Sequence, residues 1–133
     1  MKLLLDNEAD VNASRTDDGT TPLYVAAQNG HVDIVKLLLD NEANVNASRT
    51  DNGATPLYAA ALNGHVDIVK LLLDNEANVN ASRTDNGATP LYVAAQNGHV
   101  DIVKPLLDSE ANVNASRTVT VPHLCVQLLR MDM

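Results

Sequence analysis

Histidine is the residue type whose spacing first suggests chemistry in this sequence. His31, His65 and His99 recur every 34 residues, and neutral imidazole is a common zinc ligand. A zinc site needs its ligand nitrogens about 2.0–2.1 Å from one metal ion. Residues that recur once per stacked unit instead lie about 8–10 Å apart, the distance between packed helices. We therefore predict structural roles for these histidines and no metal site.

Carboxylates and a thiol are the other groups that could catalyse a reaction. Asp40, Glu42 and their repeats fall at polar helix ends, which is typical of solvated surface residues. Near-identical repeats also lack the asymmetric, desolvated pocket that acid–base pairs need. Cys125 has only His123 near it as a base, and no Gly-rich phosphate loop is present. We predict no catalytic residues, no cofactor and no enzymatic activity.

Asn-Ala-Ser, which matches the N-glycosylation pattern, occurs at Asn12, Asn46, Asn80 and Asn114. The apolar run near the N-terminus is only three leucines, whereas a secretory signal needs about 7–15 apolar residues. We therefore expect no glycosylation, and no run approaches the ~20 apolar residues of a membrane span. A single cysteine fits the cytoplasm or another reducing intracellular compartment.

Composition narrows the class of partner. The chain has 133 residues, enough for one small domain, and carries 17 acidic against 9 basic residues, a net charge of −8. An acidic surface repels nucleic acid and anionic membranes, so we predict neither as a partner. It favours a protein partner with a basic patch. Aromatic residues make up only 2%, so the core must be aliphatic.

An internal repeat organises the whole chain. Residues 19–52 and 53–86 differ at three of 34 positions, and residues 53–86 and 87–120 differ at six. A period of this size indicates a solenoid of stacked units. We divide the chain into a repeat array over residues 1–118, made of a partial unit 1–18 and units 19–52, 53–86 and 87–118. Residues 119–133 diverge from the repeat.

Each unit is predicted to form two short helices and a polar loop. Thr55 is a helix N-cap candidate before Pro56, and Gly64 ends that helix after residue 63. A second helix is predicted from about Val66 to Asp74, where apolar residues follow helical spacing. Residues 79–87 predict an extended hairpin or a long loop. Such short helices need neighbouring units to be stable.

The combined motifs resemble ankyrin repeats. They are Gly-x-Thr-Pro-Leu at 19–23, 53–57 and 87–91, then Ala-Ala-x-Asn-Gly-His, Val-Asp-Ile-Val-Lys-Leu-Leu-Leu and Ala-Asn-Val-Asn-Ala. Tetratricopeptide repeats share the 34-residue period but lack this loop and use bulky aromatic signatures. The resemblance covers residues 1–118. It implies an all-α solenoid of stacked helix-turn-helix units with protruding hairpin loops.

Four features depart from that family's pattern. The period is one residue longer than 33, so we expect a longer hairpin tip. Tyrosine replaces the family's histidine after Thr-Pro-Leu, either as packing or as an exposed row on a binding surface. Glutamate replaces a glycine that usually has positive φ, so either the glutamate is strained or the asparagine before it is left-handed. Pro105 replaces a leucine, which predicts a kinked, frayed or restarted helix. The residues concerned are Tyr24, Tyr58 and Tyr92, and Glu8, Glu42, Glu76 and Glu110.

Both ends of the array are unusual. Residues 1–18 match only part of a unit, and no polar cap precedes them. We therefore expect either self-association through poorly capped ends or a fragment of a longer array. After residue 118, Pro122 followed by Leu124, Cys125, Leu128 and Leu129 predicts either a short capping helix or a tail.

The resemblance implies a non-catalytic protein–protein interaction module. Its partner would bind the hairpin tips and the concave face of the first helices. The alternative is a consensus-like or recently duplicated scaffold with no evolved partner, because binding positions are nearly identical between units. Carried over by position, the recognition surface comprises Gln28, Asn29, Arg49, Thr50, Asp51, Asn52, Ala54, Leu62, Asn63, Arg83, Thr84, Asp85, Asn86, Ala88, Gln96 and Asn97.

Overall fold

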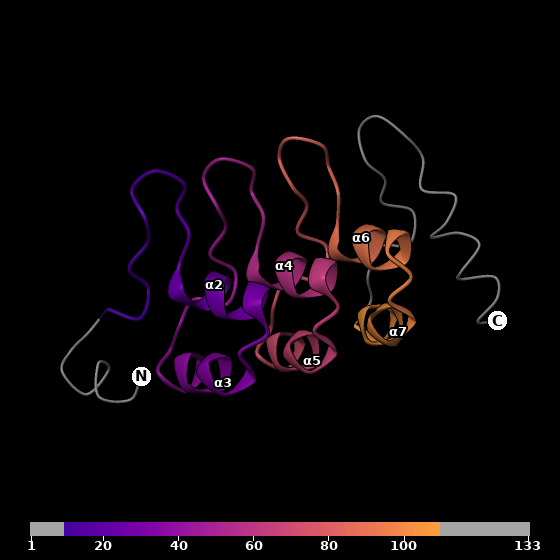
Figure 1. Ribbon diagram of the computed structural model, residues 1–133, viewed down its shortest axis with the longest axis horizontal. Coiled ribbons are helices and arrows are strands. Elements are labelled where there is room, and N and C mark those ends of the chain that lie inside the picture. The colour runs from indigo at the N-terminus through magenta and orange to yellow at the C-terminus, as the bar shows by residue number, and fades with distance from the viewer. Residues whose placement is uncertain (1–9, 110–133) are drawn as a thin grey trace.

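The computed structural model describes residues 10–109 as a row of stacked helix pairs (Figure 1). Helices α2, α4 and α6 form one row, α3, α5 and α7 form a second, and the loops project beyond the first (Figure 1). This arrangement confirms the predicted all-α solenoid, and no strand occurs within residues 10–109. The helices are α2 (Pro22–Asn29), α3 (Val32–Asp40), α4 (Pro56–Asn63), α5 (Val66–Asp74), α6 (Pro90–Gln96) and α7 (Val100–Asp108).

Helix α4 begins and ends where the sequence predicts. The Oγ1 of Thr55 accepts a hydrogen bond from the backbone N–H of Tyr58 at 3.3 Å, and Pro56 follows at the first helical position. Gly64 then ends α4 with a φ of 79°. Threonine is an effective N-cap because its side chain satisfies an amide that has no partner within the helix. The same capping starts α2 and α6.

The turns after α3 and α5 each contain a strained glutamate. Glu42 and Glu76 both have a φ of 67°. The preceding Asn41 and Asn75 have ordinary φ values of −105° and −103°. Of the two alternatives offered by the sequence, strain at the glutamate is therefore correct. A left-handed conformation costs a residue with a Cβ atom about 1–2 kcal/mol.

The predicted disruption at Pro105 is wrong in part, because the helix neither frays nor restarts there. Helix α7 runs without interruption from Val100 to Asp108 with the proline inside it. The carbonyl group that loses its donor belongs to Asp101, an exposed residue where water can replace the missing amide. On either side of the proline, Val103 and Leu106 are buried and hold the helix in the stack.

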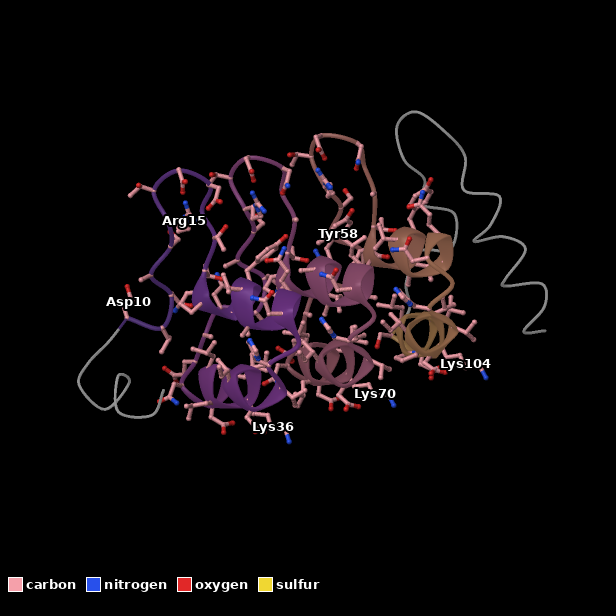
Figure 2. The ribbon with its side chains drawn as sticks, viewed as in Figure 1. Asp10, Arg15, Lys36, Tyr58, Lys70 and Lys104 are labelled. Carbon is pink, nitrogen blue, oxygen red and sulfur yellow. The ribbon has the colours of Figure 1, made fainter. Side chains whose placement is uncertain are left out.

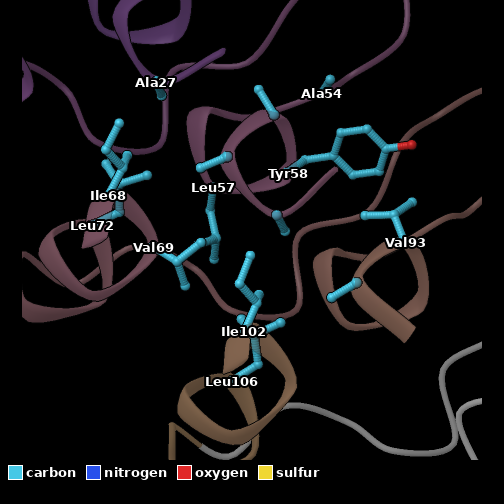
Figure 3. Close-up of a cluster of buried hydrophobic side chains, with 14 of the residues drawn as sticks. Ala27, Ala54, Leu57, Tyr58, Ile68, Val69, Leu72, Val93, Ile102 and Leu106 are labelled. Carbon is cyan, nitrogen blue, oxygen red and sulfur yellow. The ribbon is translucent and has the colours of Figure 1, made fainter. Parts of the chain in front are cut away.

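The core runs along the stack between the units. In Figure 3, Leu57 and Val69 of one unit point toward Ile102 of the next. Each first helix packs on its own second helix and on the first helix of the next unit. Alanine makes this close approach possible, because α2, α4 and α6 all bury alanines where they pack together. The fold therefore has a series of thin aliphatic interfaces instead of one central core.

Hydrogen bonds join the loops of adjacent units. The backbone N–H of Asn78 donates to Oδ1 of Asn46 at 2.7 Å, and Asn44 donates to Asn12 in the same way. Nearer the tips, the N–H of Thr84 donates to the carbonyl oxygen of Asn52 at 2.8 Å. The loops therefore form a connected sheet-like edge without regular strands.

Several sequence predictions lie outside the described residues. They are those on the start of the partial unit 1–18, on Glu8, Glu110, Asn114, His123 and Cys125, and on the capping helix or tail in residues 119–133.

Candidate functional site

The loop tips are built around an arginine held by an aspartate two residues later. Nε and Nη2 of Arg49 donate to the two carboxylate oxygens of Asp51 at 3.0 and 2.6 Å. Arg83 and Asp85 form the same two-pronged pair. These bonds raise the pKa of both arginines above the ordinary value and lower the pKa of Asp85. Each pair is neutral as a whole.

A tyrosine from the first helix of the same 34-residue unit lies under each of these arginines. Cζ of Arg49 lies 5.6 Å from the ring centroid of Tyr24, and Arg83 lies at the same distance from Tyr58. Arg83 Nη1 also lies 3.5 Å from the hydroxyl oxygen of Tyr58. An arginine over an aromatic face is a favourable cation–π contact. The arginine therefore joins the loop at the end of a unit to the first helix at its start.

The tyrosines do not form an exposed row. Tyr24 and Tyr58 are each only 5% exposed, and Tyr92 is half-buried. Packing at the start of the first helix is therefore the correct interpretation for the first two. The stacked arginines were missed by the sequence reasoning. The available signal was the constant spacing of 25 residues between each tyrosine and its arginine, which by itself does not indicate contact.

Two of the predicted recognition residues are buried. Ala54 and Ala88 are each 2% exposed, so a partner cannot reach their side chains. Their amide groups donate to Oδ1 of Asn52 and Asn86 at 2.9 Å, and their carbonyl oxygens accept from the N–H of Arg49 and Arg83. Both alanines therefore close the base of the loop, and we remove them from the recognition surface. Thr50 and Thr84, in contrast, are exposed at the tips.

The first helices contribute the other part of the predicted recognition surface, and Leu62 is the apolar residue in it. It is an apolar side chain that remains 38% exposed on α4, while its equivalents in α2 and α6 are the exposed Gln28 and Gln96. Next to it, Asn63 Nδ2 donates to the carbonyl oxygen of Ala59 at 3.0 Å. Asn29 and Asn97 are exposed at the equivalent positions.

The repeated histidines tie neighbouring first helices together. Nε2 of His65 lies 3.0 Å from the carbonyl oxygen of Gln28, and Nε2 of His99 lies 3.3 Å from that of Leu62. A Cβ atom at Gly30 would come within 2.8 Å of the His65 ring, so glycine is required there. These contacts confirm a structural role for His65 and His99. Among residues 10–109, no three metal-ligating side chains gather at one point.

Negative charge gathers away from the recognition surface. The charges of the loop tips cancel within each pair, whereas the second helices and the turns after them carry the excess of carboxylates. Figure 2 shows Lys36, Lys70 and Lys104 pointing outward from this second-helix row. The exposed carboxylates there are Asp33, Asp40, Glu42, Asp67, Asp74, Glu76, Asp101 and Asp108. The recognition surface is therefore close to neutral.

Comparison with models of known protein families gives a match to this chain. A family model described as "Ankyrin repeats (3 copies)" matches residues 1–49 and 47–117. No curated protein matches the chain. In the part that the structure describes, no helix has the length and apolar character needed to cross a membrane.

Proposed function

The chain belongs to the ankyrin repeat family, whose members are generally protein–protein interaction modules, and we propose that it binds a protein partner through its hairpin tips and first helices. The family is typically non-catalytic. The proposed surface consists of Gln28, Asn29, Arg49, Thr50, Asp51, Asn52, Leu62, Asn63, Arg83, Thr84, Asp85, Asn86, Gln96 and Asn97.

The exposure of Leu62 is the observation that carries this proposal. The side chain lies between the amide side chains of Gln28 and Gln96 at the equivalent positions, and its own carbonyl oxygen is within hydrogen-bonding distance of Asn97 Nδ2 and His99 Nε2. An apolar group on a rigid platform loses little entropy when a partner covers it. Leu62 therefore serves as the apolar anchor, and the glutamines and asparagines beside it supply hydrogen bonds.

The neutral surface defines the partner's chemistry. At the contact itself we expect an apolar side chain flanked by groups that hydrogen-bond to amides. A basic patch elsewhere on the partner would be attracted to the carboxylates of the second-helix row. Such long-range attraction raises the rate of association more than the affinity.

A scaffold without an evolved partner is the second candidate. It is favoured by the identity of equivalent positions, since Thr50 and Thr84 match, as do Asp51 and Asp85. An evolved binding surface usually differs between units, because each unit meets a different part of the partner.

The test is capture of a partner from a cell extract, identification by mass spectrometry, and titration of the purified partner by calorimetry. Leu62→Gln gives α4 the side chain found in its neighbours, and we expect it to weaken binding by roughly five- to tenfold. Val100→Gln is the control, since Val100 is another exposed apolar residue but lies on α7. Equal affinity for wild type and Leu62→Gln would refute this surface. Failure to capture any specific partner would favour the scaffold.

A further inference from the structure

Neighbouring loops meet near their tips, where the arginine of one loop lies beside the end of the loop before it (Figure 1). We call two of these places the first tip junction, formed by Asp18 and Arg49, and the second tip junction, formed by Asn52 and Arg83. At both, the N–H of the residue after the arginine donates to the carbonyl oxygen of the residue before it in the junction, at 2.8 Å. The backbones of the two junctions therefore meet in the same way.

The first tip junction holds a carboxylate. Oδ1 of Asp18 accepts a hydrogen bond from the N–H of Thr20 at 2.9 Å, and Oδ2 lies 3.5 Å from Nη2 of Arg49. Arg49 also keeps the pair with Asp51 of its own loop. A loop arginine of this chain can therefore hold two carboxylates at once, one from its own loop and one from outside it.

The second tip junction has an amide in place of that carboxylate. Oδ1 of Asn52 accepts from the N–H of Ala54 at 2.9 Å, which is the bond that Asp18 makes in its own loop. This bond identifies the oxygen, because the nitrogen of an amide side chain donates and does not accept. Nδ2 of Asn52 therefore takes the place of the second carboxylate oxygen and presents a donor to Arg83.

The second tip junction consequently has donors without a matching acceptor. A guanidinium group also only donates. Nε and Nη2 of Arg83 pair with Asp85, and Nη1 lies 3.5 Å from the hydroxyl oxygen of Tyr58. Among the hydrogen bonds within residues 10–109, none is made by Nδ2 of Asn52. The Arg83 side chain is 24% exposed and Asn52 is half-buried, so a group from outside can reach both.

A carboxylate has the chemistry that this place lacks. One of its oxygens can accept from Nδ2 of Asn52 while the other accepts from Arg83, in a charge-assisted hydrogen bond. The second tip junction would then carry the charge that Asp18 gives to the first. A lysine side chain has no acceptor and would face two donors, so it does not fit.

We propose that the partner places an aspartate or glutamate side chain in the second tip junction. This inference rests on the proposed function and adds an acidic side chain to the apolar one expected over Leu62. The first tip junction does not take such a group, because the carboxylate of Asp18 already occupies it and would repel another. The two junctions therefore fix the partner's register along units that are otherwise nearly identical.

NMR of the full chain labelled with nitrogen-15 tests the junction without a partner. Sodium acetate is the probe, raised to roughly 0.2 M in exchange for sodium chloride, so that ionic strength and screening stay constant. We expect the Nε–Hε signal of Arg83 and the side-chain amide signals of Asn52 to shift with acetate. The Nε–Hε signal of Arg49 should shift by less than about half as much, because Asp18 competes with acetate there.

Exchanging the two facing residues provides matched variants. Asn52→Asp gives the second junction the residue of the first, and Asp18→Asn does the reverse, so the fold already accepts each residue at the equivalent position. Asn52→Asp should abolish the acetate response of Arg83, and Asp18→Asn should give Arg49 a response as large as that of Arg83 in wild type. Equal responses of the two arginines in wild type, or an Arg83 response that survives Asn52→Asp, would overturn the proposal.

Calorimetry with the captured partner then tests whether the partner uses this junction. Asn52→Asp should weaken binding by about tenfold, because the added carboxylate repels the one that the partner brings. Asp18→Asn leaves the second junction unchanged and should bind as wild type does. Equal affinity for wild type and Asn52→Asp would overturn the carboxylate contact even where Leu62→Gln weakens binding. The proposed recognition surface fails separately, when Leu62→Gln binds as tightly as wild type.

Discussion

At the level of single residues, the loop arginines show how a polar side chain can hold a repeat array together. Arg83 is fixed by its two-pronged pair with Asp85 and by the ring of Tyr58 beneath it. The aspartate lies on the same loop, whereas the tyrosine belongs to α4. The pair with Asp85 therefore orients the guanidinium group, and the stacking contact holds the loop against that helix.

We predict that Arg83→Lys lowers the free energy of unfolding by about 1 kcal/mol, because lysine cannot make the planar pair and stacks less well. Urea unfolding followed by circular dichroism measures this. Arg15→Lys is the matched control: Arg15 pairs with Asp17, but its side chain is 65% exposed. Arg15→Lys should lower the free energy of unfolding by less than half as much as Arg83→Lys. Equal losses in the two variants would show that the tyrosine contact contributes nothing.

The loop carboxylates predict a loss of stability in acid. Hydrogen bonds from Arg83 lower the pKa of Asp85, and hydrogen bonds from Thr20 lower the pKa of Asp18. A carboxylate with a lowered folded-state pKa stabilises the fold above its unfolded pKa of about 3.9, and the contribution disappears as pH falls through the folded value. The free energy of unfolding should therefore fall as the pH is lowered from about 5 to about 2. This range begins just above the unfolded pKa and extends below it to the lowered folded pKa values.

Urea unfolding across that range gives the measurement. Asp85→Asn should reduce the pH dependence, because it removes one of the two groups. Asp74→Asn removes the same charge from the exposed end of α5 without touching a loop and serves as the charge-matched control. A profile for Asp85→Asn that is identical to wild type would contradict the assignment.

At the level of secondary structure, the turns after α3 and α5 are each strained at one residue. Glu76 has a φ of 67° after α5, where glycine would avoid the clash of the Cβ atom. We predict that Glu76→Gly raises the free energy of unfolding by about 0.5–1 kcal/mol, the strain relieved less the extra freedom of glycine in the unfolded chain. Thermal and urea unfolding measure the change.

Asn75→Gly is the natural comparison for that variant. Asn75 has a φ of −103°, and its Nδ2 donates to the carbonyl oxygen of Leu71 at 2.8 Å. Glycine there removes a hydrogen bond and relieves no strain, so the variant should lose stability. A gain of equal size in both variants would show that positive φ is not the cause.

The elements themselves could be predicted because their signals are local. Thr55, Pro56 and Gly64 define the bounds of α4 through capping and backbone preference alone, and the structure agrees. Contacts between units could not be read in the same way. The acceptor of His65 depends on how two units are offset in space, which no single unit encodes. The ring beneath Arg83 depends on how the loop folds back over α4, which residue spacing does not show.

Predictions failed where packing between units outweighs a local preference. Pro105 disfavours a helix interior, yet the buried Val103 and Leu106 on either side keep α7 continuous. Ala54 was predicted to lie on the recognition surface because of its position in the repeat, but its side chain is buried. Its backbone closes the loop against Arg49 and so turns its side chain inward.

At the level of the whole molecule, stability comes from units and the interfaces between them. Units 19–52 and 53–86 differ at only three positions, so the interface between them and the next one are nearly the same. In such an array the free energy of unfolding is approximately a sum of unit and nearest-neighbour contributions. A further unit with the sequence of residues 53–86, inserted after residue 86, should therefore fit both neighbours.

We predict that this insertion raises the midpoint of urea unfolding and increases the m value by roughly a third, because m follows the surface exposed on unfolding and three units become four. The control is the same insert with serine at the positions of Leu57, Val69 and Leu72, which are all buried. That insert cannot form the aliphatic interface and should leave m unchanged or lower the midpoint. If both inserts give the same m value, or if the first unfolds in two separate steps, the stack is not stabilised by additive interfaces. A higher m value for the first insert alone would show that packing between the nearly identical units makes the whole array unfold cooperatively.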